Sequence, residues 1–380
     1  MSQYIWTSES VSCGHPDKIA DCISDSVLDF YLTHDPNAKV ACETMVKNND
    51  VYVCGEIAST ANITPQQIED RVRKTINHIG YNSDELYFNG DSVKVHLNIS
   101  AQAPEINNAV VLGDELAAGD QGIMFGYATR ETPNNMPLPI YLAKKFVQTA
   151  WEHRIRLYLR PDMKSQVSVK FDGNTPIEID NVVLSMCHHE LYKLDSLRQM
   201  FHDSLKPAVL SDVPDSIRQL FTQNTKWYIN PAGTWNIGGP VSDCGLTGRK
   251  IVVDQYGADC EIGGGAFSGK DPSKVDRSAA YMARHIALKT LHQNENANKI
   301  KVQLAYAIGE KYPVSVRIWD PTTGIEYPLN GFTPEDLTPD GIINTLHLKN
   351  PIYLQTAKLG HFGINPYISD GINYFKWETV

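Results

Sequence analysis

The chain has 380 residues, of which 42% are hydrophobic and 21% charged, so we expect a globular protein of two or three domains. Lys and Arg number 34 against 44 Asp and Glu, and the net charge of −10 argues against sequence-independent binding of nucleic acid, which needs a basic surface. No run approaches the roughly 18 apolar residues of a membrane helix, and the first residues lack the basic and apolar segments of a secretory signal.

The seven cysteines form no CxxC pair and are odd in number. A disulfide framework or a zinc ribbon is therefore not expected. We expect reduced thiols and a cytoplasmic location.

The first predicted helix begins at Pro16, which suits a first helical position, with Asp17 at the positive end of the helix dipole. Apolar residues then recur at helical spacing as far as Tyr31. Three carboxylates lie off this apolar stripe, and we expect them on a solvated face: Asp21, Asp25 and Asp29.

Two strand-like runs follow, residues 39–46 and 51–57. If the last residue of the first run pairs with the first residue of the second, Glu43 and Glu56 lie on one face, because side chains alternate across a strand. Two carboxylates on one face indicate either an exposed polar side or a cation site, and the spacing alone favours the exposed side.

Thr64-Pro65-Gln66-Gln67 is a capping box that predicts a second helix, with Gly80 as its stop. Another clear helix is predicted from near Pro272 to about His292. The remaining pattern mixes helices with short strands and shows no steady alternation. We therefore predict an α+β fold with mixed or antiparallel sheets.

The segment Gly14-His15-Pro16-Asp17-Lys18 places an imidazole, a carboxylate and an amine at a helix start. The backbone N–H groups there favour an anion. His15 can donate to a phosphate oxygen, and Asp17 can bind Mg²⁺. A capped helix with exposed charges is the alternative.

A glycine-rich segment, GGGAFSGKD, spans residues 263–271. Residues 264–270 fit the first seven positions of the phosphate-binding pattern, G-x-x-x-x-G-K, but the next residue is Asp271 where the pattern needs Ser or Thr. A buried strand should also directly precede the loop, and none does. A P-loop NTPase is a poor fit, whereas a glycine loop that lets the backbone approach an anion remains plausible.

Lys270, Lys274 and Arg277 follow at spacings of four and three, roughly one helix face, with Asp276 between them. Cations with one carboxylate among them suit a polyphosphate with a divalent ion. Surface ion pairs are the alternative. A further cationic segment, residues 243–250, places Arg249 and Lys250 after a glycine-punctuated loop, and Arg can fork onto phosphate oxygens.

Two more segments, residues 119–127 and 160–166, carry weak signals when taken singly. Read together and in order, these segments resemble the S-adenosylmethionine synthase (methionine adenosyltransferase) family. The resemblance runs from Thr7 to Gly363, nearly the whole chain. The matching segments are GHPDKIAD, ACET, GDQGIMFGYAT, LRPDMKSQV, GGPVSDCGLTGRKIVVD and GGGAFSGKDPSKVDRSAAY.

The resemblance implies three α+β domains related by pseudo-threefold symmetry and interleaved along the chain. The implied boundaries are 1–13 with 131–235 for the N-terminal domain, 14–108 with 236–277 for the central domain, and 109–130 with 278–380 for the C-terminal domain. The family builds its active sites between two subunits, which implies a homodimer with shared sites, or a dimer of dimers.

The implied reaction joins ATP and methionine into S-adenosylmethionine, and the released tripolyphosphate is hydrolysed to pyrophosphate and phosphate. A thioether needs no general base, so the enzyme must align sulfur with C5′ and stabilise charge on the leaving polyphosphate. The resemblance also implies Mg²⁺, two per site, and K⁺, one per subunit. The alternatives are a glycine-loop phosphotransferase, which Asp271 opposes, and a catalytically dead binding homologue, which the full set of cations and metal ligands opposes.

The resemblance assigns roles to individual residues. The implied catalytic residues are His15, Asp120, Lys164, Arg249, Lys250 and Lys270. The implied ATP contacts are His15, Asp162, Lys164, Thr234, Trp235, Asp243, Arg249, Lys250, Ala266 and Lys270. The implied methionine contacts are Glu56, Gln102, Asp243 and Lys274. The implied metal ligands are Asp17 and Asp276 for Mg²⁺ and Glu43 for K⁺, which revises the exposed-side interpretation of Glu43.

Two departures from the family pattern concern the nucleotide and a lid. Trp235 stands where many relatives carry Phe, and its ring could stack on adenine. Ala117 stands where many relatives carry Gly, within the segment from Gln102 to Ala118 that is implied to be a mobile lid.

Overall fold

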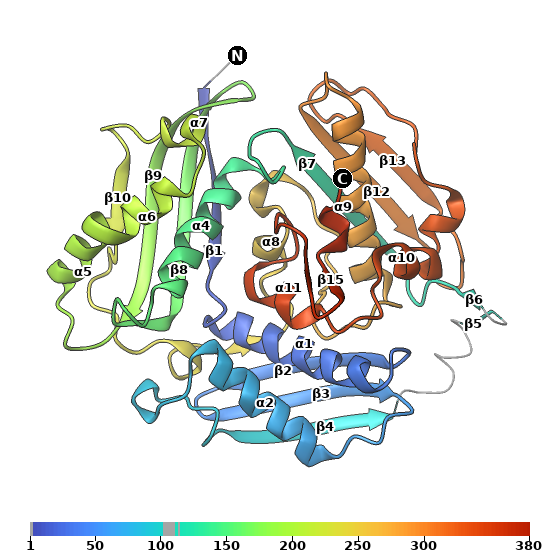
Figure 1. Ribbon diagram of the computed structural model, residues 1–380, viewed down its shortest axis with the longest axis horizontal. Helices are drawn as coiled ribbons and strands as arrows, with labels where there is room; N and C mark the ends of the chain where they lie inside the picture. Colours follow the sequence, from blue (N-terminus) through green and yellow to red (C-terminus); the bar gives the residue numbers. More distant parts are fainter. Residues whose placement is uncertain (1–2, 102–110, 113–114) are drawn as a thin grey trace.

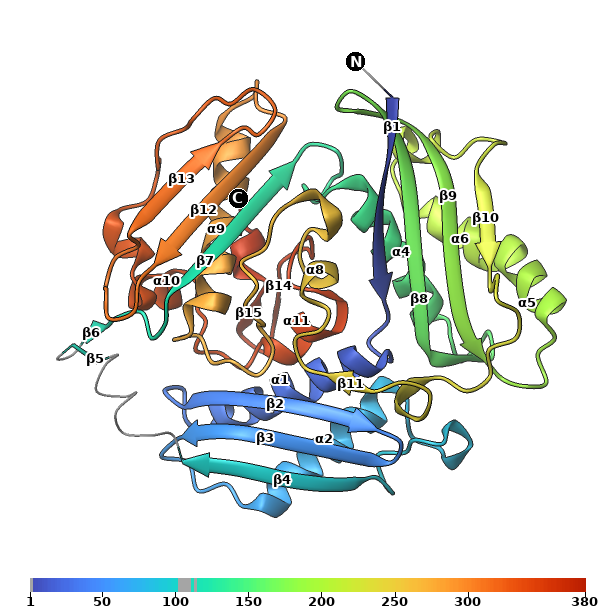
Figure 2. The ribbon, with the colours of Figure 1, turned by 180° about the vertical axis from the view of Figure 1, so that it is seen from behind.

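The computed structural model describes residues 3–101, 111–112 and 115–380. Three sheets are arranged around the centre of the molecule, and helices pack on one side of each sheet (Figure 1). Figure 1 shows the helices in front of the sheets, and Figure 2, from behind, shows the three sheets in front. One broad side of the chain is therefore built of sheet and the opposite side of helix. The sheets contain both parallel and antiparallel pairs, so the predicted α+β fold with mixed or antiparallel sheets is confirmed.

The first sheet has the strand order β11-β2-β3-β4. Its strands are β11 (Gly245–Leu246), β2 (Lys39–Lys47), β3 (Asp50–Ala58) and β4 (Lys94–Ala101). Val46 lies opposite Val51 in the antiparallel β2–β3 pair, so the predicted register is confirmed. Helices α1 (Pro16–His34) and α2 (Pro65–Ile79) cover one face of this sheet.

The second sheet has the strand order β1-β8-β9-β10, and helix α4 (Leu138–Glu152) packs on it. Its strands are β1 (Gln3–Val11), β8 (Leu159–Asp172), β9 (Thr175–His188) and β10 (Lys226–Ile229). The chain between β9 and β10 forms α5 (Leu194–Met200), a π-helical turn (Phe201–Leu205), α6 (Lys206–Ser211) and α7 (Asp215–Arg218).

The third sheet has the strand order β13-β12-β7, and helices α9 (Val275–Gln293) and α10 (Pro339–Leu346) pack beside it. Its strands are β7 (Gly122–Thr129), β12 (Lys299–Tyr306) and β13 (Ser315–Trp319). The shorter elements are β5 (Val111–Leu112), β6 (Glu115–Leu116), α8 (Ile251–Asp254), α11 (Tyr353–Leu359), β14 (Tyr367–Ser369) and β15 (Ile372–Tyr374). Each large sheet combines segments far apart in sequence, and the exact domain boundaries stay a prediction.

The predicted helix starts are confirmed for α1 and α2. His15 is the N-cap of α1, with Pro16 in the first turn. Thr64 and Gln67 form the capping box of α2, and Gly80 ends that helix with a left-handed φ of 117°. Helix α9 begins at Val275, three residues after the predicted start, because residues 270–271 pair with β2 instead.

The prediction that Asp21, Asp25 and Asp29 face solvent is wrong, since all three are buried. Helix α1 contacts β2, β11, α2 and α11, so it has no solvated side along these residues. Asp29 accepts hydrogen bonds from the backbone N–H groups of Tyr353 and Leu354 at 2.9 and 2.8 Å and so fixes the start of α11. Burial raises the pKa of Asp29 to about 7.

All seven cysteines are free thiols, as expected. Within residues 3–101, 111–112 and 115–380, no helix combines the length and the apolar character that crossing a membrane requires.

Candidate functional site

Two glycine-containing loops pair end to end along one edge of β2. Gly245 and Leu246 pair with the C-terminal part of the strand. Farther along, Cys42 N donates to Gly269 O at 3.0 Å, and Asp271 N donates to Val40 O at 3.0 Å. The segment with Arg249 and Lys250 and the segment with Lys270 therefore lie side by side, although they are separated in sequence.

Glycine is required where these loops approach their neighbours most closely. A Cβ on Gly269, whose φ is +81°, would lie 1.7 Å from Cys42 O. A Cβ on Gly263 would lie 1.8 Å from Ile123 O, on β7. The glycine loop is thus wedged between the first and third sheets, in contact with the segment 119–127. A Cβ on Gly248 would lie 2.5 Å from the Cβ of Ala266, so the two loops also touch each other.

Carboxylates on one face of α1 fasten both loops. They are four residues apart, and each accepts a backbone N–H: Asp17 from Leu246 at 3.0 Å, Asp21 from Gly248 at 2.9 Å, and Asp25 from Gly269 at 2.8 Å. The sequence pattern did not indicate Asp21 or Asp25 as site residues. The available signal was an aspartate at every fourth position of a helix that is otherwise largely apolar.

Buried cations neutralise this row of carboxylates. Lys18 Nζ lies 2.6 Å from Asp254 Oδ2 and 3.1 Å from Asp21 Oδ2. Burial alone would lower the pKa of Lys18, but the two carboxylates hold it well above its usual value. Burial also raises the pKa of Asp21 to about 7. The charged groups beneath the loops are thus partners of one another rather than of water.

Arg277 forks onto Asp25 with N–O distances of 2.6 and 2.8 Å, and both side chains are fully buried. Its guanidinium also donates to the carbonyls of Phe267 and Lys270, at 2.9 and 3.1 Å. Lys270 itself precedes α9, as does Lys274. The prediction that Lys270, Lys274 and Arg277 share one helix face is therefore wrong, and Arg277 supports the glycine loop from within.

His15 and Asp17 lie at the N-terminus of α1 beside the first cationic loop. His15 Nδ1 accepts a hydrogen bond from Asp17 N at 3.1 Å. Burial, with the charges of Lys250 and Lys164, lowers the pKa of His15 to about 3. The imidazole is therefore neutral at pH 7, with its proton on Nε2, since Nδ1 is the acceptor.

Asp17 is the anchor of the first cationic loop. Lys250 Nζ lies 2.6 Å from Asp17 Oδ2, and Arg249 Nε lies 3.6 Å from Asp17 Oδ1. Burial would raise the pKa of Asp17, but hydrogen bonds from Lys250 and from Leu246 N hold it below its usual value. Asp17 is thus an ionised carboxylate at a cationic loop.

Lys270 and Asp276 form a second pair of the same kind, with an Nζ–Oδ2 distance of 2.6 Å. Asp276 is in the first turn of α9, next to Gly122 at the start of β7. Lys274 pairs with Asp271, whose Oδ2 also accepts from Val40 N at 2.7 Å. The residue that departs from the P-loop pattern thus has a structural role, joining the glycine loop to β2.

The segment 160–166 lies beside the start of α1. Ser12 Oγ donates to Pro161 O at 2.6 Å, and Lys164 pairs with Val11 across β1 and β8. Asp162 Oδ2 accepts from Gly239 N at 2.8 Å, whereas its buried Oδ1 has no partner within the described residues. Burial raises the pKa of Asp162 to about 6. An unpaired buried oxygen is available to a polar ligand.

The remaining predicted site residues are in neither cationic loop, or they lie outside the described residues. Trp235 N donates to His188 Nε2 at 3.3 Å, and its indole donates to Ile237 O at 2.9 Å, which fixes a half-buried ring four residues before Gly239. Thr234 beside it is exposed. Gln102, and most of the implied lid, lie outside the described residues.

Several predicted residues are exposed on the open sheet side seen in Figure 2. Glu43 and Glu56 share the uncovered face of the first sheet, as their alternation predicted. Glu56 lies opposite Ala41, which in turn lies opposite Lys270, so these side chains form one row across the sheet. Lys164 on β8 is exposed on the face away from α4, since its neighbour Ser165 bonds to that helix. Asp120 before β7 and Asp243 before β11 are exposed in loops.

The donor set fits Mg²⁺ bound together with phosphate. Asp17 and Asp276 are separate carboxylates, each beside a lysine, and Mg²⁺ in proteins is usually bound through one or two carboxylates plus phosphate oxygens. Across the described ranges no group of three or more His, Cys, Asp or Glu could hold a metal ion. The protein alone would thus supply only part of a magnesium coordination shell.

Comparisons with known proteins agree along the whole chain. Three family models match it, described as the N-terminal, central and C-terminal domains of S-adenosylmethionine synthetase, over residues 3–104, 115–235 and 237–379. A protein named S-adenosylmethionine synthase from Sulfurimonas denitrificans is 47% identical over 388 residues, which cover 100% of this chain and 95% of the relative. Proteins of the same name from Desulfosudis oleivorans and Helicobacter hepaticus are 45% and 44% identical, each over 99% of this chain and 96% of the relative.

Proposed function

Because this chain belongs to the S-adenosylmethionine synthetase family, we propose that the two cationic loops on the edge of β2 bind the triphosphate of ATP during synthesis of S-adenosylmethionine. The chain is a methionine adenosyltransferase, a transferase whose substrates are ATP and methionine. The observation that carries the proposal is that the loop with Arg249 and Lys250, anchored on Asp17 beside His15, and the loop with Lys270 lie one after the other on the same edge of β2.

Lys250 and Lys270 are each held by one carboxylate, Asp17 and Asp276 respectively. A polyphosphate would compete with these carboxylates for the ammonium groups, and Arg249, which is exposed, would add a planar fork. We place the phosphate contacts on these three cations together with Lys164. Their charge stabilises tripolyphosphate as it leaves, which lowers the barrier to its departure.

Enzymes of this family depend on Mg²⁺ and K⁺. Asp17 and Asp276 would hold two Mg²⁺ ions per site, and Glu43 would hold one K⁺ per subunit. When bound, Mg²⁺ supplies further positive charge to the polyphosphate. The two carboxylates must be ionised for this, and the pKa of Asp17 is already lowered.

His15 acts as a neutral hydrogen-bond donor. Its Nδ1 is occupied by Asp17 N, so Nε2–H is the group that can reach an oxygen of ATP. We propose that it donates to the oxygen between C5′ and the α-phosphorus. Since the imidazole is neutral, this bond supports the leaving oxygen without a full proton transfer.

The sulfur of methionine attacks C5′ in line, so an S–C bond forms as the C5′–O bond breaks and its electron pair leaves on tripolyphosphate. Water then cleaves tripolyphosphate to pyrophosphate and phosphate. We assign the α-ammonium and α-carboxylate of methionine to Glu56, Gln102, Asp243 and Lys274, and stabilisation of the sulfonium to Asp120. Trp235 would stack on adenine, with Asp162, Thr234, Asp243 and Ala266 as further nucleotide contacts.

We further propose a homodimer whose sites are completed across the open sheet side, with a dimer of dimers as the larger alternative. Glu43, Glu56 and Lys164 are exposed on this side. Apolar side chains are exposed there as well: Ile5 on β1 is 51% exposed and Ile123 on β7 is 49% exposed. Large exposed apolar groups beside these exposed site residues favour a second copy of the chain as the cover.

The product assay tests the reaction. The chain is incubated with ATP, methionine, Mg²⁺ and K⁺, and nucleotides and phosphates are resolved. We expect S-adenosylmethionine, pyrophosphate and phosphate. Release of ADP would indicate the phosphotransferase alternative, and no turnover would indicate the binding homologue.

Lys270→Met tests the role of the second loop. We expect kcat to fall by about 10²–10³ with little change in the methionine KM, because Lys270 stabilises charge that grows in the transition state. Lys74→Met, on the exposed side of α2, is the matched control and should leave both constants unchanged. Equal effects of Lys270→Met on kcat and KM would contradict the assignment.

Subunit mixing tests the shared site. Chains with His15→Ala are mixed with chains with Lys270→Ala, and subunit exchange is verified. If His15 and Lys270 serve one site from different subunits, each mixed dimer regains one intact site and activity returns. No recovery after exchange would assign both residues to the same subunit's site.

A further inference from the structure

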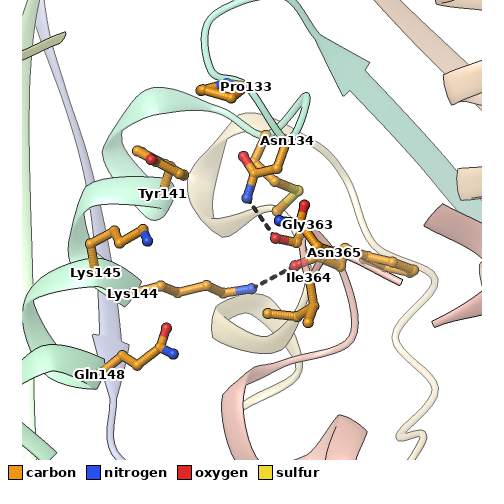
Figure 3. A pocket seen from close by; sticks show the side chains of 11 residues that line it. Pro133, Asn134, Tyr141, Lys144, Lys145, Gln148, Gly363, Ile364 and Asn365 are labelled. Carbon is orange, nitrogen blue, oxygen red and sulfur yellow. Dashed lines mark hydrogen bonds between the residues drawn. The ribbon is translucent and has the colours of Figure 1, made fainter. Parts of the chain in front are cut away.

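A cavity of about 320 Å³ lies between α4 and the segment Phe362–Asn365 (Figure 3). Tyr141, Lys144, Lys145 and Gln148 line it from α4, and the backbone of the C-terminal segment faces them. Helix α4 is on the helical side of the molecule, opposite the open sheet side (Figure 1). The cavity is therefore distinct from the ATP site and would stay accessible in a dimer formed through the sheets.

Lys144 extends across this cavity. Its Nζ donates to Phe362 O at 3.2 Å, which leaves two of the three ammonium N–H groups for another acceptor. Among the described residues, no carboxylate oxygen lies within ion-pair distance of this nitrogen. Burial lowers the pKa of Lys144 to about 8, although Asp254 and Glu378 act in the opposite direction. The positive charge of this shielded ammonium is therefore not balanced by its one carbonyl partner.

The other residues that line the cavity also favour a negatively charged ligand. Lys145 brings a second ammonium, which is held by the exposed Asp212 at 2.5 Å. None of the described lining residues is Asp or Glu. Met136, Phe362 and Ile364 provide apolar wall, and Asn365 and Gln148 provide amides. The volume is within the range of small-molecule sites.

We propose that this cavity binds a small organic oxyanion, a carboxylate or a phosphate attached to an apolar body. The oxyanion lies against Lys144, with Lys145 at the entrance, and the apolar body lies against Met136, Phe362 and Ile364. The lack of acidic lining excludes a cation as the ligand, and the apolar wall favours an organic anion over a bare inorganic one. The ligand compensates the partly buried charge of Lys144, which has no ionic partner among the described residues.

Binding is measured with two probes, phenyl phosphate and benzoate, and with phenol as the uncharged control. The chain is labelled with ¹³C at its methionine methyl groups, and the Met136 signal is assigned through Met136→Leu. We expect saturable shifts of this signal with at least one of the two anions and at least tenfold weaker binding of phenol. The tighter anion identifies the preferred head group. If neither anion shifts the Met136 signal, the proposal is refuted.

Variants separate this cavity from the polyphosphate site. Lys144→Gln should weaken the tighter probe at least tenfold, whereas Lys145→Gln, whose charge is partly exposed and already paired, should weaken it about threefold or less. Lys270→Met should leave the Met136 response unchanged, so a failure of the proposed catalytic role and a failure of this site are distinguishable. Unchanged affinity in Lys144→Gln would refute the site.

A measurement on the unmodified chain covers the case in which Lys144→Gln does not fold. Competitive acetylation across pH, read by mass spectrometry of the Lys144 peptide, gives the titration midpoint for this amine. A bound oxyanion stabilises the ammonium, so the saturating probe should move this midpoint to higher pH. A midpoint raised by about one pH unit from about 8 would slow acetylation at pH 8 by about fivefold, because less of the amine is unprotonated. An unchanged midpoint at saturation would refute the proposal.

Discussion

Asp25→Asn is expected to destabilise the chain and inactivate the glycine loop together. The Asp25 carboxylate accepts both arms of the Arg277 fork and the N–H of Gly269, and it is fully buried. An amide at this position presents an NH₂ group to one arm of the guanidinium, so one charged N–H loses its acceptor and the guanidinium keeps its uncompensated charge.

Removing one partner of a buried ion pair costs about 3–5 kcal/mol. For cooperative unfolding of 380 residues, the unfolding entropy is about 0.8 kcal/mol per kelvin at roughly 2.1 cal/mol/K per residue. The expected decrease in Tm is therefore about 4–6 °C. Since Arg277 also holds the carbonyls of Phe267 and Lys270, the same change should lower kcat.

Scanning calorimetry and steady-state kinetics measure the two effects. The matched control is Glu69→Gln, which breaks the Glu69–Arg73 pair on α2. That pair has the same N–O distance of 2.6 Å, but its side chains are 29% and 25% exposed. Exposed pairs contribute about 0–1 kcal/mol, so the control should change Tm by about 1 °C or less.

A double variant, Asp25→Leu with Arg277→Met, separates the cost of an unpaired charge from the value of the pair. Replacing both partners by apolar groups removes the buried charge, so Tm should recover part of the loss seen in Asp25→Asn. The activity should not recover, because in the double variant the carbonyls of Phe267 and Lys270 lose Arg277 as their donor. A Tm shift below 1 °C in Asp25→Asn, or a double variant that loses the sum of the single losses, would refute the reasoning.

Two further predictions concern the start of α1. The His15 pKa of about 3 lies below the unfolded value of 6.5, so His15 favours the folded state above about pH 6.5, and this contribution to stability is lost as the pH falls toward 3. In the substrate-free chain, the imidazole NMR signal of His15 should therefore not titrate between pH 5 and 8. A titration midpoint near 6.5 would contradict the burial of His15. Asp17→Asn should raise the Mg²⁺ concentration needed for half-maximal activity by about tenfold, as expected when a carboxylate ligand of Mg²⁺ is lost, and an unchanged Mg²⁺ titration would remove Asp17 from the metal site.

Short sequence signals, which act within a few residues, correctly predicted the elements that contain them. The capping box at Thr64, Pro16 in the first turn of α1 and the alternation of Glu43 and Glu56 each act within a few residues, and each is found in the structure. The later start of α9 was not predictable in this way, because residues 270–271 are held by β2, which is more than 200 residues earlier in the chain.

The acidic row on α1 shows the same limit for the site. Solvent exposure is the usual environment of an aspartate off the apolar stripe of a helix, and the sequence therefore predicts it for Asp21 and Asp25. Their partners are Gly248 N and Arg277, and neither position follows from the local sequence. The cations of the two loops, by contrast, could be located from the sequence because they follow glycines. Loops that approach other backbones as closely as these do need glycine.

The pairing of both cationic loops with β2 has a consequence for solubility. An unpaired strand edge presents N–H and C=O groups that can recruit another chain. Here the two cationic loops occupy that edge, one at Met45 and Val46 and the other at residues 40–42. A variant that releases either loop therefore leaves part of the β2 edge unpaired and able to pair with another chain. We expect such a variant to precipitate as well as to lose enzymatic turnover.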